Sequence, residues 1–334
     1  MYNKRKELYI NWKVEVFLKM LITGGAGFIG SNTAEYYYNL GHNVYVLDNL
    51  STGKRENIDF IREENFFNLD IRDYEEIKRL IKEYKFEVII HLAAVVSVVD
   101  TVENPIISNE VNINATLKLL ELNRKYNNNI QKIIFASSAA VYGNDPNLPK
   151  NLDSKICPES PYAIQKYAGE LYLKNYTKLY GLPTVGLRFF NVYGPKQNPA
   201  SQYSGVISIL KEKIENNSKF IIFGDGLQTR DFVYVKDVVK AINIVTENIK
   251  SNGNIYNVGS GKSISLIKML RMFERHYNKK LNYEYAAVRV GDVKHSLADI
   301  ELIKRLGYVP EYSIEKGISE YLSVEKVERG KVSG

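Results

Sequence analysis

The sequence predicts an α/β fold in which a doubly wound parallel sheet precedes a smaller C-terminal domain. Up to about residue 190, short apolar runs alternate regularly with helical patterns, which is typical of parallel strands joined by right-handed crossovers. After residue 191 this alternation loosens into loops that contain proline and glycine. We therefore expect a sheet domain at 14–190, completed by parts of 235–260, and a smaller domain at 191–330.

The individual elements follow from the apolar runs and from the turn residues between them. In the sheet domain we expect strands at 14–23, 43–47, 88–94, 130–136 and 184–190, and a further strand that ends at 68–71. We expect helices at 73–84, 105–126 and 162–180, and one more helix that ends near residue 40. In the smaller domain we expect helices at 206–215, 236–249, 264–277 and 313–328, and a strand at 220–223.

The composition is that of an ordinary soluble globular protein, with 45% apolar and 25% charged residues in a chain of 334. No stretch approaches the roughly 18 apolar residues of a membrane span, and the N-terminus has no signal-peptide pattern, so we expect no membrane association. The single cysteine, Cys157, excludes an internal disulfide and favours a reducing, cytoplasmic location.

The formal charge of +7 raises the question of a nucleic-acid partner. Lys and Arg are spread along the chain, however, without a long basic run or a known nucleic-acid module, so we expect no nucleic-acid binding. Four scattered His and one Cys form no metal-ligand pattern, and no metal site is expected.

A glycine-rich stretch, Gly24-Gly-Ala-Gly27-Phe-Ile-Gly30, lies between a predicted strand and a predicted helix. Glycines in this context allow a tight turn, close approach of a pyrophosphate to the backbone, and packing of helix on strand. The next strand ends at Asp48, 18 residues after Gly30, where a carboxylate accepts hydrogen bonds from an adenosine ribose and repels a 2′-phosphate. These features predict a Rossmann-type site for NAD rather than NADP.

A second candidate site combines Ser138, at the end of an apolar run, with Tyr162 and Lys166 at the start of a predicted helix. Residues four apart share one helix face, so we expect the Lys166 ammonium to lower the pKa of Tyr162 and make it a usable proton acceptor, with Ser138 as relay. A Tyr-x-x-x-Lys pair is common in a chain with 25 Tyr, but Ser137-Ser138 and the glycine motif favour catalysis. His91 is interpreted as a packed strand-end residue rather than a ligand.

Six motifs occur in a fixed order along the chain. They are Thr23-Gly-Gly-Ala-Gly-Phe-Ile-Gly30, Asp48-Asn-Leu-Ser-Thr-Gly53, His91-Leu-Ala-Ala94, Ser138-Ala-Ala-Val-Tyr-Gly143, Tyr162-x-x-x-Lys166 and Arg188-Phe-Phe-Asn-Val-Tyr-Gly-Pro195. This set resembles the extended short-chain dehydrogenase/reductase superfamily and, within it, the UDP-hexose 4-epimerases. The resemblance covers about residues 14–325, and the ordered set is highly specific.

The resemblance implies two sets of contacts and a homodimer that pairs helices 105–126 and 162–180 in a four-helix bundle. The implied NAD contacts are Gly24, Gly27, Phe28, Ile29, Gly30, Asp48, Asn49, Leu50, Ser51, Thr52, Gly53, Asp70, Ile71, Leu92, Ala93, Ala94, Asn112, Tyr162 and Lys166. The implied UDP-sugar contacts are Ser138, Tyr162, Asn191, Ile221, Ile222, Phe223, Arg230, Arg289 and Asp292. The two arginines suit a diphosphate and the aspartate a ribose diol, although a surface salt bridge is the alternative for each arginine.

The resemblance also implies a mechanism without net redox change. Tyr162 takes the proton of the sugar 4-hydroxyl with the help of Ser138, the C4 hydride passes to enzyme-held NAD⁺, and it returns to the other face of the 4-keto sugar. Related sugar-nucleotide dehydratases and decarboxylases carry acids where this chain has Ala139-Ala140, so dehydration and decarboxylation are not expected.

Substrate range in the epimerases depends on a size gate at the position of Ser296, where a Tyr restricts the pocket to plain hexoses and a small residue admits an acetamido group. We therefore predict interconversion of UDP-GlcNAc and UDP-GalNAc, with UDP-Glc and UDP-Gal also accepted. Ser97 and Gln197 are candidates for lining the acetamido pocket, or else solvated loop residues. The alternatives are a UDP-glucose or UDP-glucuronate 4-epimerase and, from another class, a non-catalytic NAD-binding regulator.

Overall fold

A computed structural model describes residues 17–197, 205–288 and 294–332 of the chain, with side chains to residue 323. Seven parallel strands form its main sheet. The strand order is β3-β2-β1-β4-β5-β6-β10. The chain first adds β2 and β3 on one side of β1 and then adds β4 and the later strands on its other side. Sheets of this kind bind ligands at this switch point between β1 and β4. The predicted Rossmann-type doubly wound sheet is confirmed. The strands are β1 (Lys19–Thr23), β2 (Asn43–Asp48), β3 (Phe66–Asn68), β4 (Val88–His91), β5 (Lys132–Ser138), β6 (Thr184–Phe189) and β10 (Ile255–Val258).

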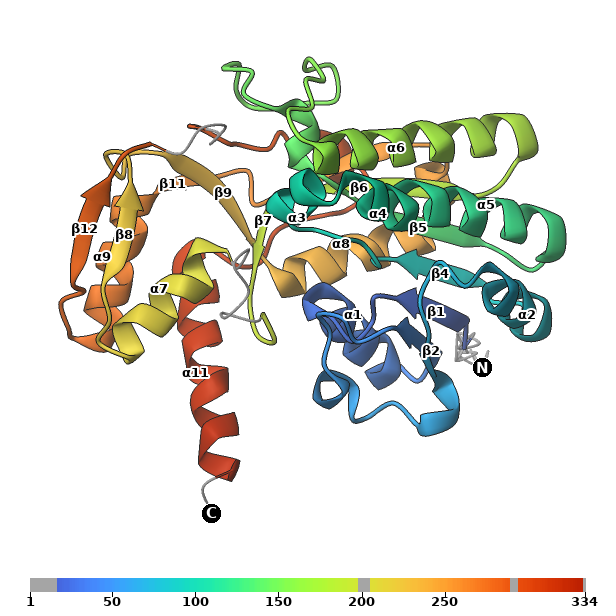
Figure 1. Cartoon of the computed structure of the whole chain (residues 1–334), viewed down its shortest axis with the longest axis horizontal. Coiled ribbons are helices and arrows are strands. Elements are labelled where there is room, and N and C mark those ends of the chain that lie inside the picture. The colour runs from blue at the N-terminus through green and yellow to red at the C-terminus, as the bar shows by residue number, and fades with distance from the viewer. Residues whose placement is uncertain (1–16, 198–204, 289–293, 333–334) are drawn as a thin grey trace, which may run out of the picture.

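Helices cover both faces of this sheet (Figure 1). The helices α2 (Tyr74–Tyr84), α5 (Ala115–Tyr126) and α6 (Pro161–Tyr180) lie on one face, and α1 (Phe28–Asn39) and α8 (Val235–Glu247) lie on the other. Side chains alternate along each strand, so both faces are apolar: Met20 and Ile22 pack with α1 and α8, and Leu21 packs under α2 and α5.

The predicted helix 105–126 is interrupted in the structure. It consists of α4 (Pro105–Asn109), a π-helical turn η3 (Glu110–Asn114) and α5, and it is preceded by the short helix α3 (Val98–Glu103). A π turn inserts one residue into the helical register, and such turns occur frequently at functional sites. Asn112, one of the predicted cofactor residues, lies in this turn.

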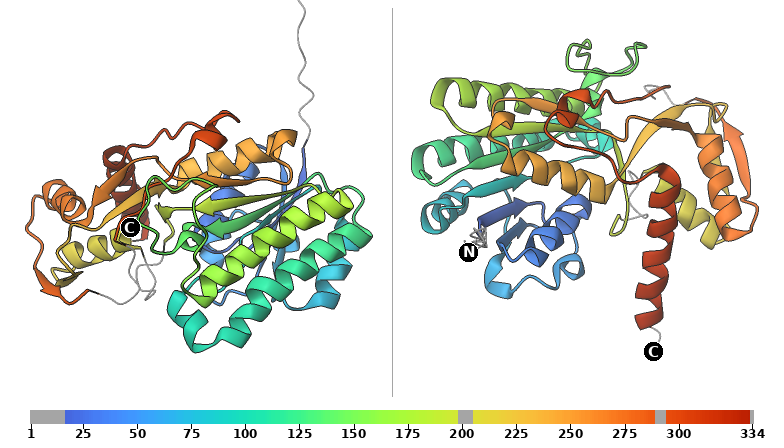
Figure 2. Two further views of the ribbon diagram at one scale, coloured as in Figure 1. Left: turned by 90° about the horizontal axis from the view of Figure 1, so that it is seen from above. Right: turned by 180° about the vertical axis from the view of Figure 1, so that it is seen from behind.

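A smaller set of elements packs beside the main sheet (Figure 2). It contains a three-stranded sheet of β7 (Asn191–Tyr193), β9 (Thr229–Tyr234) and β11 (Ser263–Ser265), and a parallel pair of β8 (Phe220–Phe223) and β12 (Tyr283–Ala286). Ile207, Ile222, Met269 and Phe273 belong to its separate hydrophobic core. Its helices are α7 (Val206–Glu215), α9 (Leu266–Tyr277), α10 (Glu301–Lys304) and α11 (Ile314–Val332). The division of the chain at residue 190 stays a prediction, because α8 and β10 return to the main sheet.

Several predicted element ends were wrong by a few residues. β3 ends at Asn68, β4 ends at His91, and β5 continues to Ser138. Helix α9 begins at Leu266 because the three residues before it pair with β9 instead. The corrected ends leave Asp70 and the stretch 92–94 in loops just beyond the carboxyl ends of their strands, where ligands bind in this fold.

Among the described residues, no helix is long and apolar enough to cross a membrane. The same part of the chain holds no group of three His, Cys, Asp or Glu side chains that could bind a metal ion. Short 3₁₀ helices occur at η1 (Arg55–Ile58), η2 (Glu63–Asn65), η4 (Ala139–Tyr142) and η5 (Ile249–Ser251).

Candidate active site

The glycine-rich turn joins β1 to α1 at the point where the strand order reverses. Gly24 has a φ of +68°, and a Cβ there would lie 2.7 Å from the backbone nitrogen of Ala93. A Cβ on Gly30 would lie 2.1 Å from the carbonyl oxygen of Gly24. Both neighbours are backbone atoms that cannot move aside, so only glycine fits. The turn thus brings the first predicted cofactor contacts against Leu92 and Ala93, which belong to another motif.

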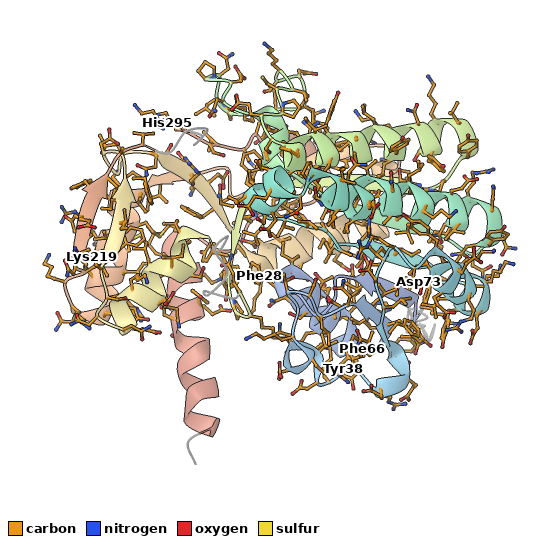
Figure 3. The ribbon with its side chains drawn as sticks, in the orientation of Figure 1. Phe28, Tyr38, Phe66, Asp73, Lys219 and His295 are labelled. Carbon is orange, nitrogen blue, oxygen red and sulfur yellow. The ribbon has the colours of Figure 1, made fainter. Side chains whose placement is uncertain are left out.

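The first turn of α1 suits a diphosphate. Gly27 is its N-cap residue, no side chain caps the helix, and no acidic residue stands in the first turn. The N–H groups of Phe28, Ile29 and Gly30 therefore have no helical acceptor and no capping side chain. Free N–H groups at the positive end of a helix attract anions. Phe28, the first residue of α1, lies in the middle of the molecule on the side toward β7 (Figure 3).

Asp48, at the end of β2, fixes the glycine turn to the loop that follows. Its Oδ2 accepts from the N–H of Ala26 at 3.0 Å, and its Oδ1 accepts from that of Leu50 at 2.8 Å. Burial raises the pKa of Asp48, and these backbone hydrogen bonds oppose the rise. A carboxylate oxygen takes more than one donor, so the predicted ribose contact remains possible. In the same loop Ser51 and Thr52 are exposed and Gly53 packs against Asp48.

Asp70 is held by two neighbours of the predicted adenosine site. Asn49 Nδ2 donates to its Oδ2 at 3.0 Å, and Arg72 donates through Nε and Nη2 at 2.9 Å each. The hydrogen bonds from Arg72 lower the pKa of Asp70 to about 2. Arg72, two residues after Asp70, was not predicted as part of this site. The side chain of Ile71 packs in the core, which leaves its main chain for the predicted contact.

A buried hydrogen-bond chain holds the loop after β4. Thr116 donates to the carbonyl of Asn112 at 2.8 Å, so its oxygen accepts from His91 Nε2 at 2.9 Å. The other ring nitrogen, Nδ1, then accepts from Thr23 Oγ1 at 2.8 Å, and Thr23 in turn accepts from the N–H of Ala93 at 3.3 Å. Burial lowers the pKa of His91 to about 3. His91 is therefore a neutral, packed strand-end residue.

Asn112 fixes the next part of the same loop. Its amide bonds both backbone groups of Val95, at 2.8 and 2.9 Å, and also donates to Gln165 Oε1 on α6 at 2.6 Å. The π turn thus connects the 92–95 loop to the helix that carries Tyr162. Ala94 lies between these attachment points and is partly exposed.

The structure brings Ser138, Tyr162 and Lys166 together at the carboxyl end of β5. Ser138 Oγ accepts from the N–H of Ala140 at 3.2 Å and hydrogen-bonds Tyr162. Lys166 is buried, with Nζ 5.7 Å from the ring centre of Tyr162 and 4.9 Å from that of Phe135. The two residues do share one helix face, as their spacing predicts.

The expected effect of Lys166 on the pKa of Tyr162 was wrong for the protein alone. Burial raises the pKa of Tyr162 to about 12, and the hydrogen bond with Ser138 opposes the rise only in part. Burial also lowers the pKa of Lys166 to about 7. The reason is desolvation, which disfavours the charged form of both groups. Activation of the tyrosine therefore needs a further positive charge in the site.

A buried ion pair fixes α6 to the sheet beneath the predicted catalytic residues. Arg188 on β6 donates to both oxygens of Glu170 on α6, at 2.8 and 2.6 Å, and Ser137 donates to the same carboxylate at 2.5 Å. The Arg188 guanidinium lies 4.8 Å from the ring centre of Tyr142, whose hydroxyl donates to Asn257 at 2.7 Å. This network fixes the position of α6 relative to β5 and β6.

The segment 294–299, which carries Ser296, lies against the start of β9. The N–H of Ser296 donates to the carbonyl of Thr229 at 3.0 Å. Arg230 Nη1 donates to the carbonyls of Thr229 and Lys294, at 3.0 and 3.2 Å. The main chain of the predicted size gate is therefore fixed, and only its side chain can vary the space beside it.

Asp231, fully buried on β9, holds the same segment from beneath. It accepts from the N–H and hydroxyl of Ser260, from the N–H of Gly261 and from the N–H of Ala298, at 2.7 to 3.1 Å. Lys150 pairs with the segment along its other side. The 294–299 segment is thus attached to both parts of the molecule.

The remaining predicted substrate residues are dispersed. Asn191 is exposed at the start of β7, Gln197 has a buried Oε1 with no hydrogen-bond partner among the described residues, and buried Ser97 caps α3 through Asp100. On β8, Ile221 and Phe223 are accessible on one face, but Ile222 is fully buried in the core of the smaller domain. Side-chain contact with a ligand is thus excluded for Ile222 in this conformation. Arg289 and Asp292 lie outside the described residues.

The residues that hold the site rather than line it were not predicted from the sequence. Asp231, Asn257 and Thr23 each bond a segment far away in the chain. One signal was available, because each is a polar side chain within an apolar strand. Such residues are buried only when hydrogen-bonded, so the pattern predicts an anchor but not its partner.

The chain was compared with known proteins. The sequence model of the NAD dependent epimerase/dehydratase family matches residues 20–259. The chain is 42% identical over 305 residues to a putative UDP-glucose 4-epimerase of Methanocaldococcus jannaschii, covering 91% of this chain and 97% of that protein. Among solved structures it is similar to a UDP-N-acetylglucosamine 4-epimerase from Methanobrevibacter ruminantium, in complex with UDP-N-acetylmuramic acid (36% identity, TM-score 0.85, 92% and 99% covered). A UDP-glucose 4-epimerase with UDP-glucose from Thermotoga maritima is similarly close (35% identity, TM-score 0.87, 92% and 99% covered).

Proposed function

Because the chain belongs to the NAD dependent epimerase/dehydratase family, we propose that it interconverts UDP-GlcNAc and UDP-GalNAc, and accepts UDP-Glc and UDP-Gal as further substrates. The enzyme is an isomerase, an NAD-dependent UDP-sugar 4-epimerase. The observation that carries the proposed chemistry is the meeting of Ser138, Tyr162 and Lys166 beside the glycine-rich turn.

The proposed chemistry assigns a separate task to each of these side chains. Tyr162 takes the proton of the sugar 4-hydroxyl and later returns one, and Ser138 orients both hydroxyls through its hydrogen bond with Tyr162. Lys166 supports the phenolate from one helical turn away. NAD, when bound, supplies hydride acceptance and return at C4, and its positive nicotinamide favours the phenolate. The turn η4 begins with Ala139 and Ala140, so it offers no carboxylate for an elimination.

One feature of the structure supports an acetamido substrate. Ser296 is small and half-buried on a main chain fixed by Thr229, so an acetamido group meets no bulky side chain at this position.

The test follows conversion of UDP-GalNAc, UDP-Gal and UDP-glucuronate by NMR, on wild-type protein and on Ser296→Tyr. We expect UDP-GalNAc to be converted at least as fast as UDP-Gal by the wild type. The bulky ring should lower kcat/KM for UDP-GalNAc at least tenfold more than for UDP-Gal, since a side-chain clash costs about 1–3 kcal/mol. Tyr162→Phe serves as the catalytic control, and it should lose turnover while still holding NAD.

Each outcome has a definite reading. Equal losses on both sugars in Ser296→Tyr would contradict the size gate. Conversion of UDP-Gal alone would make the protein a UDP-glucose 4-epimerase, the activity after which two of the similar proteins are named. Conversion of UDP-glucuronate alone would replace the substrate proposal with the third sugar pair.

We also propose that the enzyme is a homodimer. The helices α3, α4, α5 and α6 lie side by side on the outside of the molecule (Figure 2), and several apolar side chains of α3, α4 and α6 are exposed. Large exposed apolar areas mark interaction sites in soluble proteins. The exposed apolar residues of this face, here called the bundle face, are Val98, Val99, Val102, Ile106, Ile107, Ile164 and Leu171.

A further inference from the structure

The segment Gly194–Lys196, here called the strap, follows β7 where the chain crosses from the main sheet to the smaller domain. It is attached to the first two turns of α1, at the end of the helix that carries the proposed diphosphate site.

Asn32 makes the first attachment. Its Nδ2 donates to the carbonyl of Phe28 at 2.9 Å, within the first turn of α1, and to the carbonyl of Pro195 at 3.1 Å. One amide group therefore bonds both the N-terminal turn of the helix and the strap. Asn32 is partly buried, so these bonds are shielded in part from competing water.

Lys196 makes the second attachment, independently of the first. Its Nζ lies 2.8 Å from Glu35 Oε2 on the next turn of α1 and donates to the carbonyl of Asn57 at 3.1 Å. Asn57 in turn donates from Nδ2 to the carbonyl of Ala26 within the glycine-rich turn, at 2.9 Å. The lysine side chain also covers the ring of Phe60, with Nζ 5.5 Å from its centre. Lys196 thus holds the strap to α1 and to the element that supports the glycine-rich turn.

The backbone of the strap is shaped for this attachment. Gly194 has a φ of +151°, and a Cβ there would lie 2.6 Å from Val235 Cγ1. Lys196 itself adopts a φ of +68°, which is unfavourable for a residue with a side chain. A lysine keeps this left-handed backbone conformation only where its surroundings stabilise it. Here the two hydrogen-bonding partners of Nζ supply that stabilisation.

We propose that Asn32, Glu35 and Lys196 are positioning residues that retain NAD, by fixing the strap across the diphosphate end of α1. An epimerase needs such retention, because the hydride taken from C4 must return to the same sugar and the cofactor must stay for the whole turnover. The inference uses the proposed diphosphate site at α1 and is independent of which UDP-sugar reacts.

The experiment measures how fast purified holoenzyme loses NAD into an enzymatic trap that consumes free NAD. Asn32→Ala and Lys196→Met each remove one attachment, and we expect NAD to dissociate about tenfold faster from each. Lys196→Arg keeps the charge and should restore the slow rate. The matched control is Lys219→Met, which breaks another exposed Lys–Glu pair, with Glu284 at 2.9 Å, on the far side of the smaller domain (Figure 3). A thermal melt of each variant identifies any general loss of stability.

The outcomes separate this inference from the proposed function. Wild-type protein that holds NAD and variants that lose it no faster than Lys219→Met would overturn the role of the strap alone, and epimerisation would be unaffected. Faster release in all four variants, in proportion to a lower melting temperature, would likewise overturn it, because the attachments would then be merely structural. Wild-type protein that holds no NAD and converts no UDP-sugar would overturn the strap and the proposed function together.

Discussion

Burial acts on Tyr162 and Lys166 in opposite directions, and both shifts favour the uncharged forms. The pKa of Tyr162 rises to about 12 and that of Lys166 falls to about 7. Near pH 7 the tyrosine is therefore neutral and the lysine is only partly charged, which makes Tyr162 a poor proton acceptor. The positive nicotinamide expected beside it favours the phenolate, so catalytic competence depends on the bound cofactor. The site would thus be activated only when its hydride acceptor is present.

The stability of the protein freed of NAD should report the shift at Lys166. Below about pH 7 Lys166 is charged in both the folded and the unfolded protein, so the folded state bears the full free-energy cost of burying the charge. Between about pH 7 and 10 the unfolded chain binds the proton and the folded protein does not, so the free energy of unfolding rises with pH. Urea unfolding at pH 7 and pH 9 should show a larger gain for wild type than for Lys166→Met.

Neighbouring groups do not disturb this comparison. His91 has a pKa near 3 and stays neutral throughout the window, and the raised pKa of Tyr162 acts only above about pH 10. Buried Lys132, with a pKa of about 8, contributes equally to both proteins and cancels in the difference. An equal gain in wild type and Lys166→Met would show that Lys166 is not desolvated as described.

At the scale of elements, Asn257 on β10 connects the catalytic turn to the segment that carries Ser296. Its Oδ1 accepts from Tyr142, at the end of the turn η4 that begins after Ser138. Its Nδ2 donates to the carbonyl of Lys150 at 2.7 Å and to that of Asp299 at 3.2 Å. The elements proposed to carry catalysis and to line the sugar site thus share one buried amide, although they are far apart in sequence.

Asn257→Asp should break this connection with almost no change of shape. It replaces two donated hydrogen bonds by an acceptor facing two carbonyls, so we expect unfolding to become easier by about 1–3 kcal/mol and kcat/KM to fall. Asn254→Asp is the control, because Asn254 also donates to two carbonyls, at 3.0 and 3.3 Å, but is exposed. Denaturant unfolding of both variants compares them. A change of less than about 0.5 kcal/mol at Asn257 would contradict its role as an anchor.

These elements show which features can be predicted from the sequence. The glycine-rich turn, Asp48 and the Tyr162 and Lys166 pair were predictable, because each depends on local spacing along a strand or helix. The π turn at Glu110–Asn114 was not, since its register depends on bonds from Asn112 to Val95 and Gln165. The short strands β7, β9, β11 and β12 were missed for a related reason. They are paired by partners far away in the chain, and three to six residues carry little periodic signal.

At the scale of the whole molecule, the functional groups come from both parts of the chain. The proposed NAD site lies on the main sheet, whereas Arg230 and Ser296 belong to the smaller domain. The strap and the 294–299 segment join the two parts at separate places, through Asn32 and through Lys150. The relative position of the two parts is therefore fixed by polar attachments as well as by apolar packing. The spacing between the proposed cofactor and sugar sites would depend on those attachments.

The bundle face gives the last prediction, which concerns assembly. Ile106 is 76% exposed and lines a surface hollow of about 340 Å³ together with Pro105, Asn109, Glu110 and Asn114. A second copy of the same face would cover such residues and fill the hollow, because identical faces pair about a two-fold axis. Ile106→Glu should therefore convert a dimer to a monomer, since each of two symmetric contacts would bury a charge.

Sedimentation analysis of wild type, Ile106→Glu and Ile249→Glu measures the effect. Ile249 is 80% exposed on η5, outside the bundle face, so the same charge there should leave the dimer intact. Both substitutions alter solvent-exposed side chains and should change folding stability by less than about 0.5 kcal/mol. A wild-type monomer, or a dimer that survives Ile106→Glu, would show that this face does not pair two subunits.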